Sequence, residues 1–187
     1  MSDLFHWDEL NFLRQDAVQF IRDARQKKPD RGAIDGFLDY MEFVLCLIYM
    51  YGWHDAEEIV GTVPFADGLD DRSVNLEIKG ETFRQRVERQ IDELSEEGIL
   101  RIIETESHRD YNTGVVDAGL SSGKSARKTW NTMLDDRVRE THDYLEGMTV
   151  DIGDSFYTYD GDSAMYPGGF SLPENNVNCR CYVTLTM

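Results

Sequence analysis

The residues best able to do chemistry in this sequence are one histidine and two cysteines in its last third, His142, Cys179 and Cys181. Two thiolates and an imidazole are ligands that zinc prefers. A cysteine beside a histidine can also act as a nucleophile with its general base, here with Asp143 in line behind His142. The third interpretation is structural, because cysteines pack as small hydrophobes and a buried histidine can satisfy backbone carbonyls.

The pattern around the cysteines favours the structural interpretation. Side chains alternate from Cys179 to Met187, so both thiols are expected on the inward face of a last strand over 179–187. A thiol buried on an apolar face is unreactive. A zinc site would need a fourth ligand, and one residue between the cysteines is a tighter spacing than usual. We therefore predict no catalytic residue and no cofactor, and keep His142, Cys179 and Cys181 as weak metal candidates.

A helix is predicted over residues 134–145, in the middle of this region. Asp135, Arg139 and His142 recur at four- and three-residue spacing, which would place them on one helical face. Gly147 is expected to follow the end of this helix.

The first part of the chain is predicted to be helical. Apolar residues at three- and four-residue spacing indicate helices over 8–28, 33–51, from Glu81 to Gly98, and over 99–116. Gly52 is expected to break the second of these before a short helical turn at 55–60, and Gly98 to separate the last two. The second half of helix 33–51 is apolar all round, which predicts burial on more than one side. A short strand is possible at 74–78.

Short strands separated by turns are predicted in the last part of the chain. They cover 127–133, 148–150, 156–159 and 179–187. The acids Asp151, Asp154, Asp160 and Asp162 are interpreted as solvated turns and not as a calcium loop, whose required glycine is missing. These elements predict an α+β protein, with a mainly helical region at 1–118 and a small mixed α/β domain with a short antiparallel sheet at 119–187.

Composition limits the partners that this chain can have. Its 187 residues carry a formal charge of −17, with 41% hydrophobic and 11% aromatic residues, which is typical of a globular and strongly acidic protein. Direct DNA binding is disfavoured, because affinity for phosphate comes mainly from lysine and arginine, although Lys124, Arg127 and Lys128 could make a local contact. Three cysteines and no secretory signal predict a protein made in the cytoplasm. The longest apolar run, 43–51, is too short to span a membrane.

From about Arg101 onward, an ordered series of short motifs resembles the Mu F-like family of minor head (head morphogenesis) proteins of tailed phages. The matching residues are Thr105-Glu106 with Arg109, Tyr111-Asn112 and Gly114; Lys128-Thr129-Trp130; Asp135, Arg137-Val138-Arg139 and His142; Leu145 and Gly147 with Thr149-Val150; Phe156; Met165-Tyr166-Pro167-Gly168; and Asn178-Cys179-Arg180-Cys181. The resemblance covers about the last half of the chain.

The resemblance implies a virion protein of few copies that is assembled in the host cytoplasm. It would act in procapsid assembly or genome delivery, on the portal side of the head interior, with the portal and other head proteins as partners and without enzymatic activity. Trp130 is expected to pack between helix and sheet, Arg137 and Arg139 to pair with acids such as Asp135 or with turn carbonyls, and Pro167-Gly168 to fix a turn.

An enzymatic alternative remains open. Family members are also found joined to toxin domains, so a hydrolase or nuclease could use His142 with Arg137, Arg139 or Cys179.

Overall fold

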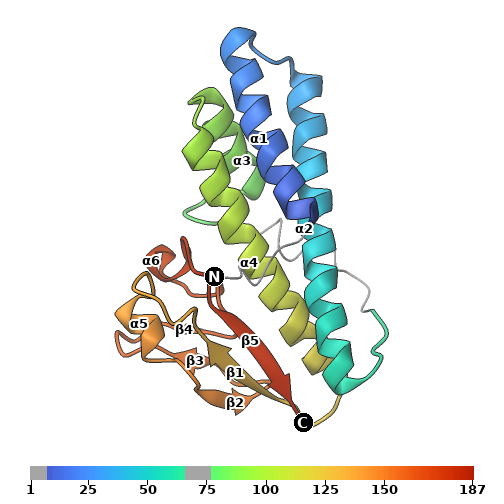
Figure 1. The fold of residues 1–187 in the computed structure, drawn as a ribbon, viewed down its shortest axis with the longest axis vertical. Coiled ribbons are helices and arrows are strands. Elements are labelled where there is room, and N and C mark those ends of the chain that lie inside the picture. Colours follow the sequence, from blue (N-terminus) through green and yellow to red (C-terminus); the bar gives the residue numbers. More distant parts are fainter. Residues whose placement is uncertain (1–7, 66–76) are drawn as a thin grey trace.

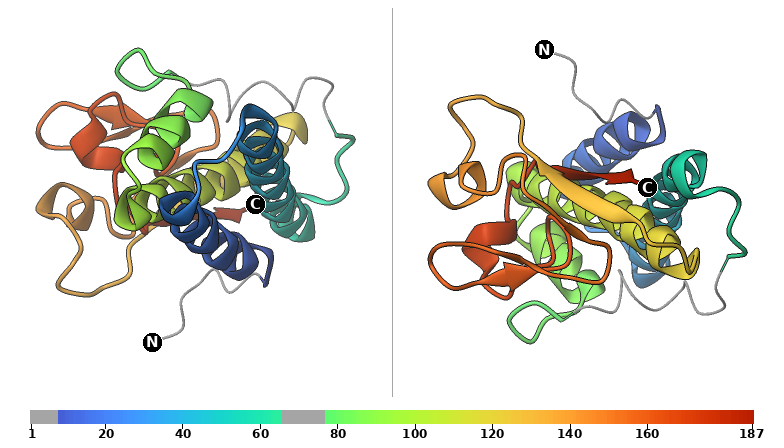
Figure 2. Two further views of the ribbon diagram at one scale, coloured as in Figure 1. Left: turned by 90° about the horizontal axis from the view of Figure 1, so that it is seen from above. Right: turned by 90° about the horizontal axis from the view of Figure 1, so that it is seen from below.

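The computed structural model describes residues 8–65 and 77–187, which form four helices of ten or more residues, two short helices and a small group of strands. The helices are α1 (Asp8–Gln26), α2 (Arg31–Val60), α3 (Phe83–Asp92) and α4 (Glu96–Ser121). α4 runs beside α2 and continues to the strands, which lie against its second half (Figure 1). Seen along the long axis, α1 and α2 lie on one side of α4, and most of the strands and short helices lie on the other (Figure 2).

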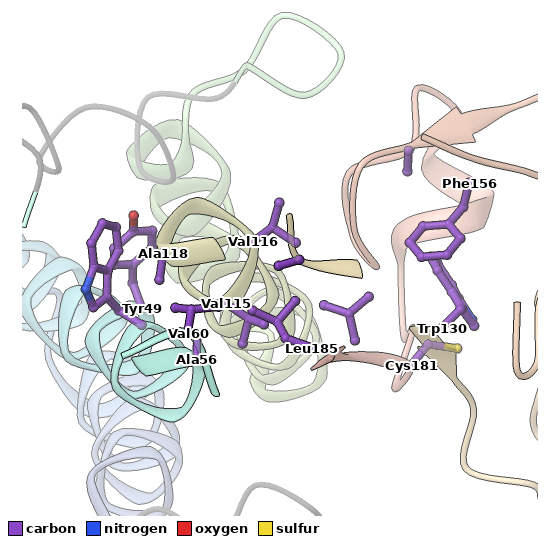
Figure 3. Packing of buried hydrophobic residues seen from close by; sticks show 14 of the residues in the cluster. Tyr49, Ala56, Val60, Val115, Val116, Ala118, Trp130, Phe156, Cys181 and Leu185 are labelled. Atoms are coloured by element: carbon purple, nitrogen blue, oxygen red, sulfur yellow. The ribbon is translucent and has the colours of Figure 1, made fainter. Parts of the chain in front are cut away.

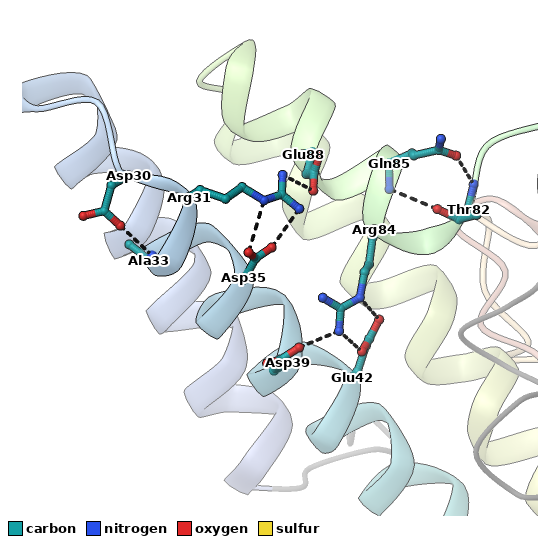
Figure 4. Close-up of polar contacts among 10 residues, drawn as sticks. All are labelled: Asp30, Arg31, Ala33, Asp35, Asp39, Glu42, Thr82, Arg84, Gln85 and Glu88. Atoms are coloured by element: carbon teal, nitrogen blue, oxygen red, sulfur yellow. Dashed lines mark hydrogen bonds and ion pairs between the residues drawn. The ribbon is translucent and has the colours of Figure 1, made fainter.

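Side-chain caps mark where α2 and α3 begin. The Asp30 carboxylate accepts a hydrogen bond from the Ala33 N–H at 2.9 Å at the start of α2. At the start of α3, Thr82 and Gln85 form a reciprocal capping box, in which each side chain bonds the other's backbone N–H (Figure 4). Such caps satisfy N–H groups that a helix leaves without an internal partner.

Ion pairs attach α3 to the beginning of α2. Arg31 bonds Asp35 at 2.7 Å and reaches Glu88 on α3 at 2.9 Å, whereas Arg84 on α3 pairs with Glu42 at 2.5 Å (Figure 4). These contacts are partly exposed, so each contributes little stability. Their consequence is to orient the two helices.

The predicted break at Gly52 is wrong, since α2 continues through it to Val60. A Cβ atom at Gly52 would lie 2.0 Å from the Tyr111 carbonyl oxygen of α4, and one at Gly114 would lie 2.1 Å from the Tyr49 carbonyl oxygen of α2. The two glycines therefore face each other's helix backbone where α2 and α4 pack most closely. The sequence alone does not reveal that these two glycines pack against each other's helix.

The predicted break at Gly98 is displaced by a few residues. Gly98 lies in the first turn of α4, and its N–H donates to the Ser95 hydroxyl at 3.0 Å. The chain turns at Glu93–Ser95, where Leu94 has a φ of +54°. The second half of the predicted helix 33–51, which lies in the middle of α2, is also less buried than predicted, because Phe43 is 61% and Met50 44% exposed. Most of the possible strand at 74–78 lies outside the described residues, and Ile78 makes an isolated bridge with Glu81.

The strands form two antiparallel sheets. β1 (Arg127–Asn131) lies between β2 (Thr149–Asp151) and β5 (Tyr182–Thr186), with Trp130 opposite Val183. β3 (Phe156–Tyr157) pairs with β4 (Ser163–Ala164). The short helices α5 (Glu140–Asp143) and α6 (Pro173–Asn176) lie in the connections. The α+β class is confirmed, with a mainly helical first part and a small antiparallel sheet after it.

Two groups of buried side chains hold the molecule together. One lies among α1, α2, α3 and α4 and includes Leu13, Leu45 and Ile103. The other joins the second halves of α2 and α4 to the strands, from Tyr49 and Val116 to Trp130 and Leu185 (Figure 3). This second core includes residues on both sides of position 118, where the division of the chain into two domains was predicted. None of the described helices is long and apolar enough to cross a membrane.

We predict that Gly114→Ala lowers the free energy of unfolding by about 1–3 kcal/mol, the usual cost of overpacking. The added methyl group meets the α2 backbone, which cannot move aside as a side chain can. Urea unfolding followed by circular dichroism measures the change. The matched control is Gly36→Ala in α2, where the added Cβ has no atom within 4 Å apart from its chain neighbours and the nearby backbone of its own helix. It should raise stability by about 0.5–1 kcal/mol. Equal stabilities for the two variants would contradict the close contact.

Candidate functional site

His142, Cys179 and Cys181 meet in the interior of the C-terminal part. The Cys179 and Cys181 sulfur atoms each lie 3.5 Å from His142 Nδ1. His142 comes from α5, and both cysteines precede β5. All three residues are buried, with at most 4% of their surface exposed. The sequence correctly placed both thiols inward, although β5 begins only at Tyr182, after the second cysteine.

Aromatic rings surround the histidine. The Trp130 ring meets His142 edge-on at 5.4 Å, and the Phe170 ring stacks on it at 5.3 Å. Phe156 in turn packs edge-on against Trp130 at 5.2 Å. These contacts fix the orientation of the imidazole and make the face of the site that they cover apolar.

The two thiols differ in acidity. Hydrogen bonds from Cys181 and then His142 hold the pKa of Cys179 well below its ordinary value, against the effect of burial. The pKa of Cys181 is raised by its hydrogen bond to Cys179 and by burial. Because the two thiols interact directly, the first proton lost from this group belongs to the pair and not to either cysteine alone.

The predicted helix over 134–145 is wrong, because only Glu140–Asp143 are helical. Asp135 lies in a turn, where it pairs with Arg180 at 2.6 Å and Arg137 at 3.4 Å. The Arg180 hydrogen bond is the main reason that the pKa of Asp135 falls to about 2. Arg139 donates to the Val177 carbonyl. Long-range partners thus determine this conformation, and both arginines have the kind of partner that was expected.

The other family-motif residues occupy turns around this group. Gly147 has a φ of +71° and donates its N–H to the Trp130 carbonyl at 2.9 Å, so the chain reverses direction after α5. Pro167 and Gly168 are buried, and Gly168 has a φ of +92°. Asn178 adopts a φ of +58° just before the first cysteine. Positive φ values suit glycine and asparagine.

A buried charge cluster on α3 and α4 was not predicted from the sequence. Glu106 is 1% exposed and pairs with Arg86 at 2.7 Å and with Arg109. Arg109 Nε donates to the Gly168 carbonyl at 2.8 Å. The cluster therefore fixes the Pro167-Gly168 turn to α4. Its sequence signal was the Glu106 to Arg109 spacing together with the family motif.

Asn112 makes a second link from α4. Its amide oxygen accepts from the Val183 N–H at 2.9 Å, and its amide nitrogen donates to the Cys181 carbonyl at 3.2 Å. This single buried side chain thus positions both the second cysteine and the beginning of β5. No periodicity could reveal it, because the partners are far apart in sequence.

Asp162 is also a structural residue, which corrects its interpretation as part of a solvated turn. Its buried carboxylate accepts hydrogen bonds from Ser163, Ser171, Leu172 and Asn175, including the Ser171 hydroxyl at 2.7 Å. Burial opposes the charge, but these donors lower the pKa to about 2. Asp162 therefore organises the connection from β4 to α6.

The possible local contact with DNA at Lys124, Arg127 and Lys128 loses one of its three cations to the core. Lys128 is fully buried, and its ammonium donates to the Ile152 carbonyl at 2.9 Å. Burial lowers the pKa of Lys128 to about 8. Lys124 donates to the Val60 carbonyl, and exposed Arg127 lies 3.6 Å from Asp151. Two of the three cations are thus used to hold the fold together.

We predict that Asp162→Asn lowers the free energy of unfolding by about 1–3 kcal/mol at neutral pH, since a charged acceptor of several hydrogen bonds is lost. The folded-state pKa of about 2 lies below the ordinary 3.8. The contribution of this carboxylate is therefore present above about pH 4 and is lost as the pH falls toward 2. The variant should show a flatter decline over that window in thermal unfolding. Asp136→Asn, at an exposed acid, is the control, and an unchanged acid profile for Asp162→Asn would contradict this role.

Comparison with known proteins identifies the family. Residues 72–184 match the family described as Phage Mu protein F like protein. Minor head protein GP7 of Bacillus phage SPP1 is 29% identical over 79 residues, which is 41% of this chain and 26% of that protein. The NAD(+)--arginine ADP-ribosyltransferase EFV of Enterococcus faecalis is 34% identical over 92 residues, 48% of this chain and 19% of that protein.

The chain thus matches only about a fifth to a quarter of the length of these curated relatives. No solved structure matches it significantly. The family match covers more than half of the 187 residues and includes α3, α4 and nearly all of the C-terminal part. The chain therefore belongs to the phage Mu F-like family.

Proposed function

We propose that this chain is a phage minor head protein that acts in procapsid assembly or genome delivery without catalysing a reaction. The observation that carries the proposal is the Mu F-like match over residues 72–184. The similarity to a protein named as a minor head protein points in the same direction. We place the chain inside the virion head on the portal side, with the portal and other head proteins as partners.

The chemistry of the C-terminal part supports a structural role. The polar side chains that stand out there bond to the fold itself: Asp135 to Arg180, and Arg139 to the Val177 carbonyl. His142 and Cys179 lie buried behind aromatic rings. A hydrolase or nuclease that used them would need them open to substrate and water. Arg137 is exposed, and its guanidinium pairs with Asp135 in the same turn.

The similarity to an ADP-ribosyltransferase does not favour an enzyme. It covers 19% of that protein, so the activity in its name belongs to a chain about five times as long as the matched part. Catalysis requires groups that contact the substrate, and sequence similarity over a shared segment does not supply them.

Net charge suggests what kind of surface the chain meets. With a formal charge of −17, it is repelled by duplex DNA and is complementary to a basic protein surface. We therefore expect its contacts in the head to be with protein, and expect those contacts to weaken as salt is added.

Co-assembly tests the proposal. The chain is co-expressed with the portal and major capsid proteins of its phage, procapsids are separated on a density gradient, and the ratio of this chain to portal is measured by mass spectrometry. We predict that it sediments with procapsids at a few copies per particle. Omission of the portal should remove it from the particles if the portal is its attachment point.

Matched variants make the result specific. Gly36→Ala, which leaves both cores intact, should co-sediment like the wild type, whereas Gly114→Ala should be depleted in proportion to its loss of folded protein. Particles that contain portal and capsid protein but lack this chain, with the chain folded and soluble in the same cells, would refute the proposal. Retention after omission of the portal would refute only the portal attachment.

A further inference from the structure

The three buried donors His142, Cys179 and Cys181 face one point. Their ligand atoms all lie within 4.8 Å of one another, and both sulfur atoms are 3.5 Å from the same imidazole nitrogen. We propose that this group binds a zinc ion, with Cys179 Sγ, Cys181 Sγ and His142 Nδ1 as ligands.

The spacing of the donors fits a tetrahedral ion. Zinc lies about 2.3 Å from sulfur and about 2.0–2.1 Å from nitrogen, so a tetrahedral site places sulfur and nitrogen about 3.6 Å apart. The observed distance is 3.5 Å for each cysteine. The donors would need almost no movement to bind the ion.

A metal ion would use the same three atoms more fully than hydrogen bonds do. One imidazole nitrogen faces two sulfur atoms at equal distance, whereas a hydrogen bond through its single N–H or lone pair is best directed at one of them. A cation at the centre would interact with all three atoms at once. Two thiolates would also neutralise the charge of a divalent ion, which makes the buried site electrically balanced.

The fourth position has room for solvent. A small cavity of about 10 Å³ is lined by His142, Cys179 and Cys181 together with Arg139 and neighbouring residues. This is about the space that one water molecule requires. A water molecule in this space would complete a site of three protein ligands and one water. Soft thiolates select zinc over magnesium or calcium, which prefer oxygen ligands.

The surrounding contacts hold the ligands in place before the ion arrives. Asn112 fixes the Cys181 carbonyl, and the Cys179 N–H donates to the Asn176 carbonyl at 3.0 Å. Trp130 and Phe170 set the plane of the His142 ring. A bound ion would join α5 to the segment before β5, two parts that are far apart in sequence. Its expected effect is to stabilise the C-terminal part.

Metal content tests the site. Tag-free protein, purified with a reductant and without chelator, should contain about one equivalent of zinc by mass spectrometry, since a preorganised site retains its ion. Cys179→Ser and Cys181→Ser should each reduce bound zinc to background. Cys46→Ser, at a cysteine of α2 outside this group, is the matched control and should retain it.

Cobalt substitution gives a readout that does not depend on variants folding. Adding Co²⁺ to metal-stripped wild-type protein should produce thiolate-to-cobalt absorption, and zinc should abolish it by displacement. Zinc should also raise the Tm of the stripped protein. Zinc below about a tenth of an equivalent in fresh protein, with no cobalt absorption and no change in Tm, would overturn the site. Another metal in its place would overturn the assignment to zinc.

Discussion

The close packing of α2 against α4 is the constraint on which the rest of the structure depends. Gly52 and Gly114 let the two helix backbones approach at a distance that any side chain would prevent. That contact fixes α4, and α4 then presents Arg109 to the Pro167-Gly168 turn and Asn112 to the last strand. The C-terminal part has few long elements of its own. Its conformation depends largely on hydrogen bonds to side chains of α4.

Such bonds explain why a small, loop-rich part can have one conformation. A buried polar group costs free energy unless it is hydrogen-bonded, so conformations that leave one of these groups without its partner are disfavoured. The Asp162 carboxylate accepts hydrogen bonds from the connection between β4 and α6, including one from the Leu172 N–H. Lys128 of β1 donates to the Ile152 carbonyl. The apolar core around Trp130 is then completed by segments that these polar contacts have already positioned.

The sequence predicted the fold class and the main helices, because apolar periodicity reflects burial directly. It failed where distant partners decide the structure. Gly52 was interpreted as a helix end, although its role is set by α4, and residues 134–145 have helical spacing but follow the bonds of Asp135 and Arg139. At the candidate site, alternation correctly placed both cysteines inward. It could not show that His142 lies equally far from each, nor that Asn112 holds one of them.

The position of β5 has a consequence for biosynthesis. This strand follows every other described element along the chain, yet Val183 and Leu185 pack into the same core as Tyr49 and Trp53 from α2. The helices can therefore form while the ribosome is still translating, but the second core stays open until the last strand has emerged. During that interval its apolar surface is accessible to chaperones and to other nascent chains. A polypeptide built this way gains its final shape late, when translation of these residues is complete.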